Sequence, residues 1–134
     1  MIDHQNDIVA ACLSGASDKS LSFQQIAATL EGEGFESLLV DFRRSAATFY
    51  QSGDGAAVVA RLKPTQGMVG HVFAEAEIRS AIKRTSRGSY QYGCLEWWND
   101  LVEAGCAGFI ASFSAHRVIY FGRNAEALII QEDA

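Results

Sequence analysis

The chain repeats its own pattern of apolar residues and glycines at an offset of 71 residues (105 minus 34). Leu30 corresponds to Leu101, and Gly34 corresponds to Gly105, each pair at the end of a predicted helix. The apolar pairs that follow are Leu38 and Phe109, Phe42 and Phe113, Phe49 and Tyr120, Val58 and Ile129, and Val59 and Ile130. Chance would match scattered apolar positions, whereas one gapless shift keeps every feature in order. The repeat therefore predicts an internal duplication.

Each repeat is predicted to contain two helices followed by three strands. Apolar residues at helical spacing predict helices over about residues 3–14, 22–31, 74–86 and 90–104. Alternating apolar residues predict strands over 36–44, 46–51, 56–62, 108–114, 117–122 and 127–131. The short turns between these strands favour antiparallel pairing, because parallel strands need long crossover connections.

These elements predict an α+β fold, in which an αα-βββ unit is duplicated. We expect an antiparallel sheet of about six strands with helices packed on it. Residues 1–134 are interpreted as a single domain with pseudo-repeats over about 3–62 and 74–133 and a linker over about 63–73. Two facing three-stranded sheets are the alternative arrangement. We favour the continuous sheet with its helices on one face.

The charge balance excludes several classes of protein. Eleven Lys and Arg residues stand against sixteen Asp and Glu residues, which gives a net charge of -5. The basic residues Arg79, Lys83 and Arg87 share one helical face, which is interpreted as solvated, and no nucleic-acid partner is expected. No apolar run approaches the ~18 residues of a membrane span, so no membrane contact is expected. The first residues do not resemble a signal peptide, which favours a cytoplasmic location.

The cysteines and histidines do not form a recognisable catalytic or metal site. Cys12, Cys94 and Cys106 are scattered without a CxxC pair, which indicates reduced thiols and neither a disulfide framework nor a zinc clamp. His71 precedes Glu75 and Glu77, but carboxylates two positions apart point to different faces of a helix. We therefore expect no metal, no cofactor and no catalytic residue. An enzyme that uses Cys94 or His71 is the third-ranked hypothesis.

Aromatic residues of the second helix in each repeat are the predicted ligand-binding residues. They are Phe23, Tyr90, Trp97 and Trp98. Adjacent tryptophans on a helix lie about 100° apart, so one of them is expected at the edge of the apolar stripe. A tryptophan at such an edge can line a ligand pocket or a subunit contact, although packing in the core is the simpler interpretation.

Three segments carry a family resemblance. They are KRTSRG, YGCLEWWNDLVEAG and FIASFSAHRVIYFG, and GFESLLVDF and FYQSGDG add a looser likeness. Together they resemble the YbcV-like (DUF1398) family of small bacterial proteins of unknown function. Some members of that family are labelled phage envelope proteins. The resemblance implies a chain of about this length and brings no established catalytic residues.

The leading hypothesis is a non-enzymatic cytoplasmic domain that binds a small ligand or a partner at the seam between its two repeats. A seam of this kind offers a concave apolar site with groups arriving from both sides. The alternative is a structural or protein-interaction protein that acts as a homo-oligomer, such as a homodimer, through a sheet edge or an exposed tryptophan.

Overall fold

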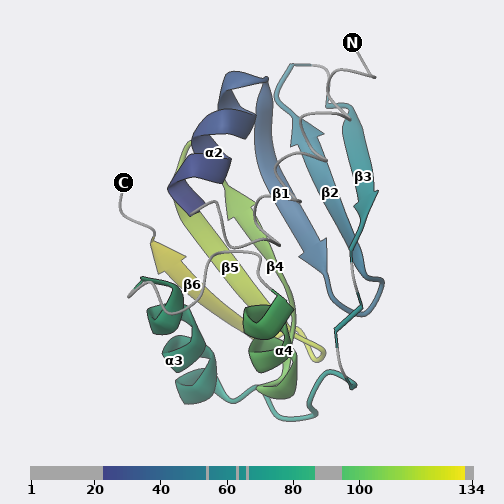
Figure 1. The fold of residues 1–134 in the computed structure, drawn as a ribbon, viewed down its shortest axis with the longest axis vertical. Helices are drawn as coiled ribbons and strands as arrows, with labels where there is room; N and C mark the ends of the chain where they lie inside the picture. Colours follow the sequence, from purple (N-terminus) through teal and green to yellow (C-terminus); the bar gives the residue numbers. More distant parts are fainter. Residues whose placement is uncertain (1–22, 54, 63, 66, 87–94, 132–134) are drawn as a thin grey trace.

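The computed structural model describes residues 23–53, 55–62, 64–65, 67–86 and 95–131 (Figure 1). The first part of the chain contains α2 (Phe23–Gly32), β1 (Phe35–Asp41), β2 (Ala46–Gln51) and β3 (Ala57–Arg61). The second part contains α3 (Glu75–Ser86), α4 (Leu95–Glu103), β4 (Cys106–Ser112), β5 (Arg117–Gly122) and β6 (Ala127–Gln131). The helix expected over about 3–14 lies outside the described residues, as does the expected start of the helix over 90–104.

The six strands form one continuous antiparallel sheet in the order β3-β2-β1-β4-β5-β6. The three described helices lie on one face of it (Figure 1). The fold is therefore α+β with a six-stranded sheet, and the alternative of two separate sheets is wrong. Pairing of β1 with β4 joins the two parts, because it satisfies backbone groups that each three-stranded unit would otherwise leave at an open edge.

Alternate side chains of the strands fill the space between the sheet and the helices. The buried residues of β1 and β4 are apolar at every second position, as at Leu38, Val40, Phe109 and Ala111. Phe49 of β2, Val118 and Tyr120 of β5, Leu128 of β6, and Leu30 and Leu101 of the helices complete the same cluster. The period of two in the sequence thus corresponds to one face of the sheet packed on the helices.

The pairing of β1 with β4 is symmetric about Leu39 and Ile110, which lie opposite each other. Phe42 N donates to Ala107 O at 3.0 Å, and the corresponding Phe113 N donates to Glu36 O, also at 3.0 Å. Backbone angles repeat as well. Gly34 and Gly105 have φ values of 92° and 95°, and Ser45 and His116 have φ values of 51° and 52°. The three-stranded units therefore share their local geometry as well as their element order.

The bounds of β1, β3 and β4 differ from the sequence-based prediction. The strand expected over 36–44 ends at Asp41, because the chain turns over the next four residues. The strand expected over 108–114 begins at Cys106, directly after Gly105 ends the last turn of α4. The offset of 71 residues holds through β5 and becomes 70 at β6, because the turn before β6 is one residue shorter than the turn before β3. Val58 therefore corresponds to Leu128, and Val59 corresponds to Ile129.

Candidate functional site

Of the four predicted ligand-binding aromatic residues, the structure describes the side chains of Trp97 and Trp98, and both are buried. Trp97 and Trp98 are 0% and 4% exposed, so α4 presents neither indole to solvent. Trp97 Nε1 donates to Ala81 O of α3 at 2.9 Å, and Trp98 packs against Phe42. Trp97 also packs against Phe109 of β4 and Tyr120 of β5. The side chain of Phe23 and the whole of Tyr90 lie outside the described residues.

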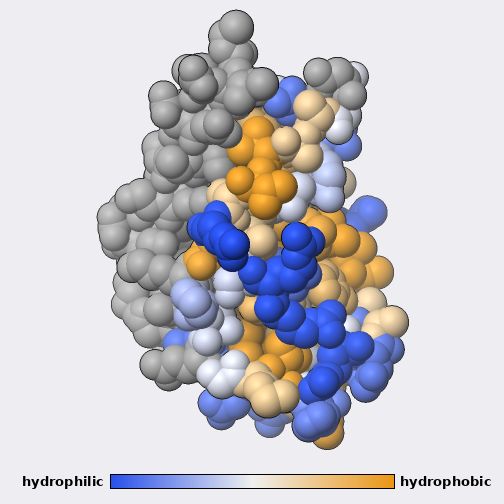
Figure 2. Space-filling model, turned by 90° about the vertical axis from the view of Figure 1, so that its right-hand side faces the viewer, coloured by the Kyte–Doolittle hydropathy of each residue, from blue (hydrophilic) through white to orange (hydrophobic). Residues whose placement is uncertain are grey.

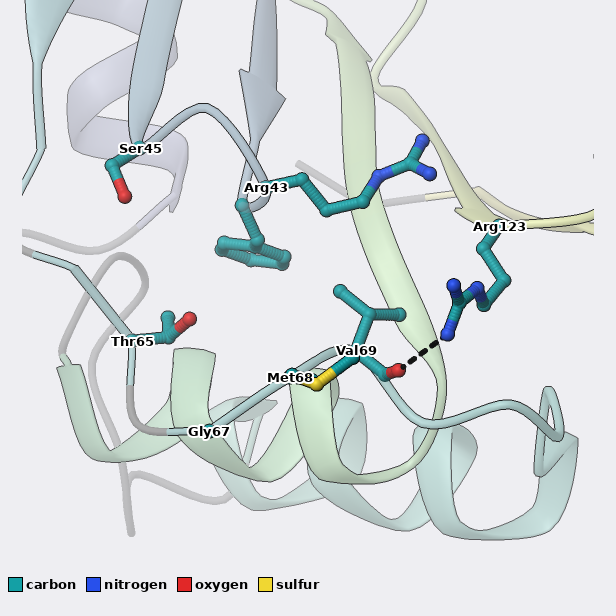
Figure 3. A pocket seen from close by; sticks show the side chains of 8 residues that line it. Arg43, Ser45, Thr65, Gly67, Met68, Val69 and Arg123 are labelled. Carbon is teal, nitrogen blue, oxygen red and sulfur yellow. Dashed lines mark hydrogen bonds between the residues drawn. The ribbon is translucent and has the colours of Figure 1, made fainter.

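A cavity of about 310 Å³ opens where the two parts of the chain meet, and we call it the seam cavity. Its walls come from the β1–β2 turn, the linker before α3 and the β5–β6 turn (Figure 3). The lining residues are Phe42, Arg43, Ser45, Thr65, Gly67, Met68, Val69 and Arg123. The sequence predicted a site at this seam but assigned its wall to different residues.

The β1–β2 turn is held by a carboxylate. Oδ1 of Asp41 accepts hydrogen bonds from the backbone N–H groups of Arg43 at 3.0 Å and Arg44 at 3.2 Å. Ser45 completes the turn with a positive φ of 51°. An acidic side chain that accepts from the amides two and three positions ahead is a common way to fix a tight turn. The turn directs Phe42 inward and leaves Arg43 exposed at the rim of the seam cavity.

The floor of the seam cavity is apolar and well supported. Phe42 is buried, and its ring centroid lies 5.9 Å from that of Trp98 and 6.0 Å from that of Phe109. Val69 is buried beside it, whereas Met68 is 76% exposed at the mouth. Tilted and edge-on aromatic contacts of this kind restrict the ring. The predicted tryptophan residue Trp98 therefore supports the floor from behind and does not line it.

The linker wall is fixed against the end of α4. Gly70 N donates to Val102 O at 3.0 Å, and Ala74 N donates to Ala104 O at 2.8 Å. These bonds satisfy carbonyl groups that the end of a helix leaves unpaired. At Gly105 a Cβ atom would lie 2.0 Å from Val72 O, so only glycine allows the linker to approach this closely.

Two arginines face the seam cavity from opposite parts of the chain. Nη1 of Arg123 donates to Val69 O at 3.3 Å and lies 3.2 Å from His71 Nδ1. In the described part of the chain, neither Arg43 nor Arg123 forms an ion pair with a carboxylate. Figure 3 shows both guanidinium groups on one side of the cavity, with the hydroxyl groups of Ser45 and Thr65 on the other. The cavity therefore has a cationic end, a hydroxyl-bearing end and an apolar floor.

His71 and Glu75, which were considered as metal ligands from the sequence, each contact an arginine. Glu75 Oε2 lies 3.1 Å from Arg79 Nε, which forms an exposed ion pair within α3, and His71 contacts Arg123. Over the residues that the structure describes, no group of three or more His, Cys, Asp or Glu side chains could hold a metal ion. The ion pair with Glu75 partly neutralises the basic helical face to which Arg79 and Lys83 belong. The third residue of that face, Arg87, lies outside the described residues.

Cys106 is a buried thiol. Its Sγ donates to Gly108 O at 3.1 Å, and burial raises the pKa of the thiol from 9.0 to about 12. Hydrogen bonds with the backbone of Gly108 and Phe121 oppose that rise. A thiol that stays protonated is a poor nucleophile, so the geometry makes Cys106 a packing residue. Cys12 and Cys94 lie outside the described residues.

Comparisons with known protein families and with curated proteins give no match to this chain. None of the described helices has the length and apolar character needed to cross a membrane. The candidate site therefore rests on the geometry of the seam cavity. Sequence reasoning missed Arg43, Met68 and Arg123 as lining residues, because turn and linker residues of these types are usually solvated. The available signal was the position of Arg123 directly after a predicted strand and that of Met68 in the predicted linker.

Proposed function

We propose that this protein binds a small organic anion in the seam cavity. The observation that carries the proposal is the pair of guanidinium groups, Arg43 and Arg123, without carboxylate partners among the described residues and beside a buried apolar floor. Guanidinium groups bind carboxylate and phosphate strongly, since they combine charge with several directed donors. A cavity with apolar walls and a few polar groups is the usual form of a ligand site.

The dimensions and the chemistry of the cavity define the ligand class. About 310 Å³ is near the lower limit of ligand pockets, which favours a compact molecule. Phe42 and Val69 suit an apolar body, the arginines suit its anionic group, and Ser45 and Thr65 suit a polar group at the far end. Arg123 is already oriented by Val69 O, whereas exposed Arg43 is free to adjust to the ligand.

Binding without catalysis is the form of function that the lining supports. Among the described residues of the lining there is no carboxylate, thiol or imidazole, which are the side chains that most often act as nucleophile or general base. An enzyme that uses His71 or Cys94 is the alternative. It would require a reacting group outside the lining of the seam cavity.

We further propose that the chain arose by duplication of its helix–helix–strand–strand–strand unit. The reciprocal bonds of Phe42 and Phe113 support this proposal, as do the repeated backbone angles at Gly34 and Gly105. Membership of the YbcV-like family and a cytoplasmic location stay predictions from the sequence.

Titration with benzoate, followed by amide chemical shifts in NMR, tests the binding proposal. Benzamide serves as the neutral ligand of the same shape. Benzoate is expected to shift the amides of the β1–β2 turn and the linker. Arg123→Gln and Arg43→Gln are each expected to weaken binding about tenfold, which corresponds to the loss of one charge-assisted contact.

Arg61→Gln is the matched control. Arg61 lies with Arg44 at a separate hollow of about 470 Å³ beside β3. Figure 2 shows the side of the molecule where β3 lies, with a band of hydrophilic residues between hydrophobic areas. Equal binding of benzamide and benzoate would contradict the proposal. A loss of affinity in Arg61→Gln as large as that in Arg123→Gln would do the same.

A further inference from the structure

The face of the sheet opposite the described helices carries a row of five aliphatic side chains and one threonine, which we call the aliphatic row. The row crosses all six strands, and each residue pairs directly with the next: Val59, Thr48, Leu39, Ile110, Ile119 and Ile129. Val59 is 64% exposed, Ile129 is 60% exposed and Ile110 is 42% exposed. A contiguous apolar surface of this kind marks an interaction site more often than single exposed side chains do.

We propose that this open face packs against the open face of a second copy of the chain, forming a homodimer of two stacked sheets. A second copy is the occupant that fits best because the face is symmetric in itself. Leu39 and Ile110 lie at its centre, and Val59 and Ile129 lie at equivalent ends. A two-fold dimer needs a surface that complements itself, and an aliphatic row with this symmetry does so.

Two further rows flank the aliphatic row on the same face. One consists of Arg61, Ala46, Asp41, Gly108, Phe121 and Ala127, and the other of Ala57, Tyr50, Ser37, Ser112, Arg117 and Gln131. Only Arg61, Asp41 and Arg117 are charged. Asp41 already accepts two backbone hydrogen bonds in its own turn. The face therefore carries few charges that would need to be desolvated in a dimer.

Charge placement in the flanking rows is compatible with two-fold stacking. With the dimer axis along the strands, Arg117 lies opposite Tyr50 and Arg61 lies opposite Ala127. With the axis along the rows, Arg117 lies opposite Phe121 instead, and Arg61 lies opposite Ala57. Neither arrangement brings like charges together, and both place a guanidinium group over an aromatic ring, which is a favourable contact.

The area of the face is sufficient for a stable dimer. Six strands about 4.8 Å apart, with three rows about 7 Å apart, give a face of roughly 30 by 20 Å once side chains are included. Each copy would bury about 600 Å², or about 1,200 Å² for the pair, at the lower limit of specific protein interfaces. Stacked sheets with interdigitating aliphatic side chains are a common packing arrangement.

Sedimentation velocity over a wide range of protein concentration tests this proposal on the 134-residue chain. The native protein is expected to approach twice its monomer mass of 14.5 kDa as concentration rises. Ile110→Glu at the centre and Ile129→Glu near the edge are each expected to weaken the dimer at least tenfold. Both residues are exposed on strands, so the fold should persist, and circular dichroism checks this. Val72→Glu is the matched control, since Val72 is 75% exposed but lies in the linker.

A dimer that survives both substitutions on the face would overturn the proposal. Survival in Ile110→Glu alone would indicate pairing through the sheet edges and would also overturn it. A native chain that remains monomeric at every concentration would exclude the second copy as the occupant. Dissociation by Ile110→Glu and Ile129→Glu, with Val72→Glu still dimeric, supports the stacked dimer. Benzoate binding is measured separately, so its failure would not affect this result.

Discussion

Leu39 of β1 and Ile110 of β4 lie opposite each other at the centre of the sheet and hold the same position in the two three-stranded units. The pairing of β1 with β4 is symmetric about these two residues. The segments outside the strands are less alike, because the linker is hydrogen-bonded to the end of α4 and approaches Gly105 closely in the second unit. A residue in one unit can therefore serve as the control for its equivalent in the other unit, where the two differ in a single contact.

Substitution of Gly34 and Gly105 by alanine should separate backbone strain from linker packing. Both glycines have a positive φ near 90°, at 92° and 95°. A Cβ atom at Gly34 meets nothing within 4 Å, but at Gly105 it would lie 2.0 Å from Val72 O. Gly34→Ala is expected to lower the free energy of unfolding by about 1–2 kcal/mol, and Gly105→Ala by clearly more. Urea unfolding measures both values, and equal losses would show that the linker does not pack there.

Trp97→Phe should destabilise the protein more than Trp98→Phe. The two substitutions remove the same atoms from neighbouring buried residues. Trp97 loses its hydrogen bond to Ala81 O, whereas Nε1 of Trp98 is buried without a partner among the described residues. Loss of an unpaired buried N–H offsets part of the cost of a smaller ring. We expect a difference of about 1–3 kcal/mol in the free energy of unfolding, and the reverse order would contradict this account.

The buried thiol of Cys106 should make stability fall at alkaline pH. Its pKa is raised to about 12 in the folded protein, against 9.0 for the free group, so the unfolded chain loses this proton first. The contribution is complete below about pH 9 and declines as pH rises toward about 12. Relative to Cys106→Ala, the native protein should lose about 1 kcal/mol of unfolding free energy between about pH 8 and pH 10. A constant difference between the two proteins over that range would exclude the effect.

Asp41→Ala should weaken both the fold and the proposed ligand site. The substitution removes the acceptor for two amides of the β1–β2 turn, which is expected to cost about 1–2 kcal/mol of stability. Because this turn carries Phe42 and Arg43, benzoate affinity should fall several-fold. Ser112→Ala is the control, since Ser112 Oγ accepts from Ala115 N at the equivalent place in the second unit. An equal loss of benzoate affinity in both variants would show that the Asp41 turn does not position the ligand site.

The strands were predictable from the sequence because burial alternates along most of them. The alternation of Leu38, Val40 and Phe42 with polar or partly exposed neighbours identifies β1 without tertiary information. The ranges predicted for β2, β5 and β6 agree with the structure at both ends. The bounds of β1, β3 and β4 differ from the prediction. At the end of β1 and the start of β4 the cause was a local bond or a glycine conformation that apolar spacing does not reveal.

The candidate site was less predictable than the fold. Helical spacing assigned its wall to Trp97 and Trp98, but packing against α3 and the sheet buries both indoles. The seam itself was predicted, whereas Arg43 and Arg123 were not. Arginines that follow a strand or lie in a turn have no pattern that distinguishes a solvated side chain from one beside a cavity.

By itself, the sequence determined the α+β class, the ranges of β2, β5 and β6 and the order of the elements, because these depend on the spacing of apolar residues and glycines along the chain. Only the tertiary structure decided which residues surround the seam cavity and which form the row around Ile110. Such neighbourhoods depend on strand order and register, which bring distant residues together without leaving a periodic signal.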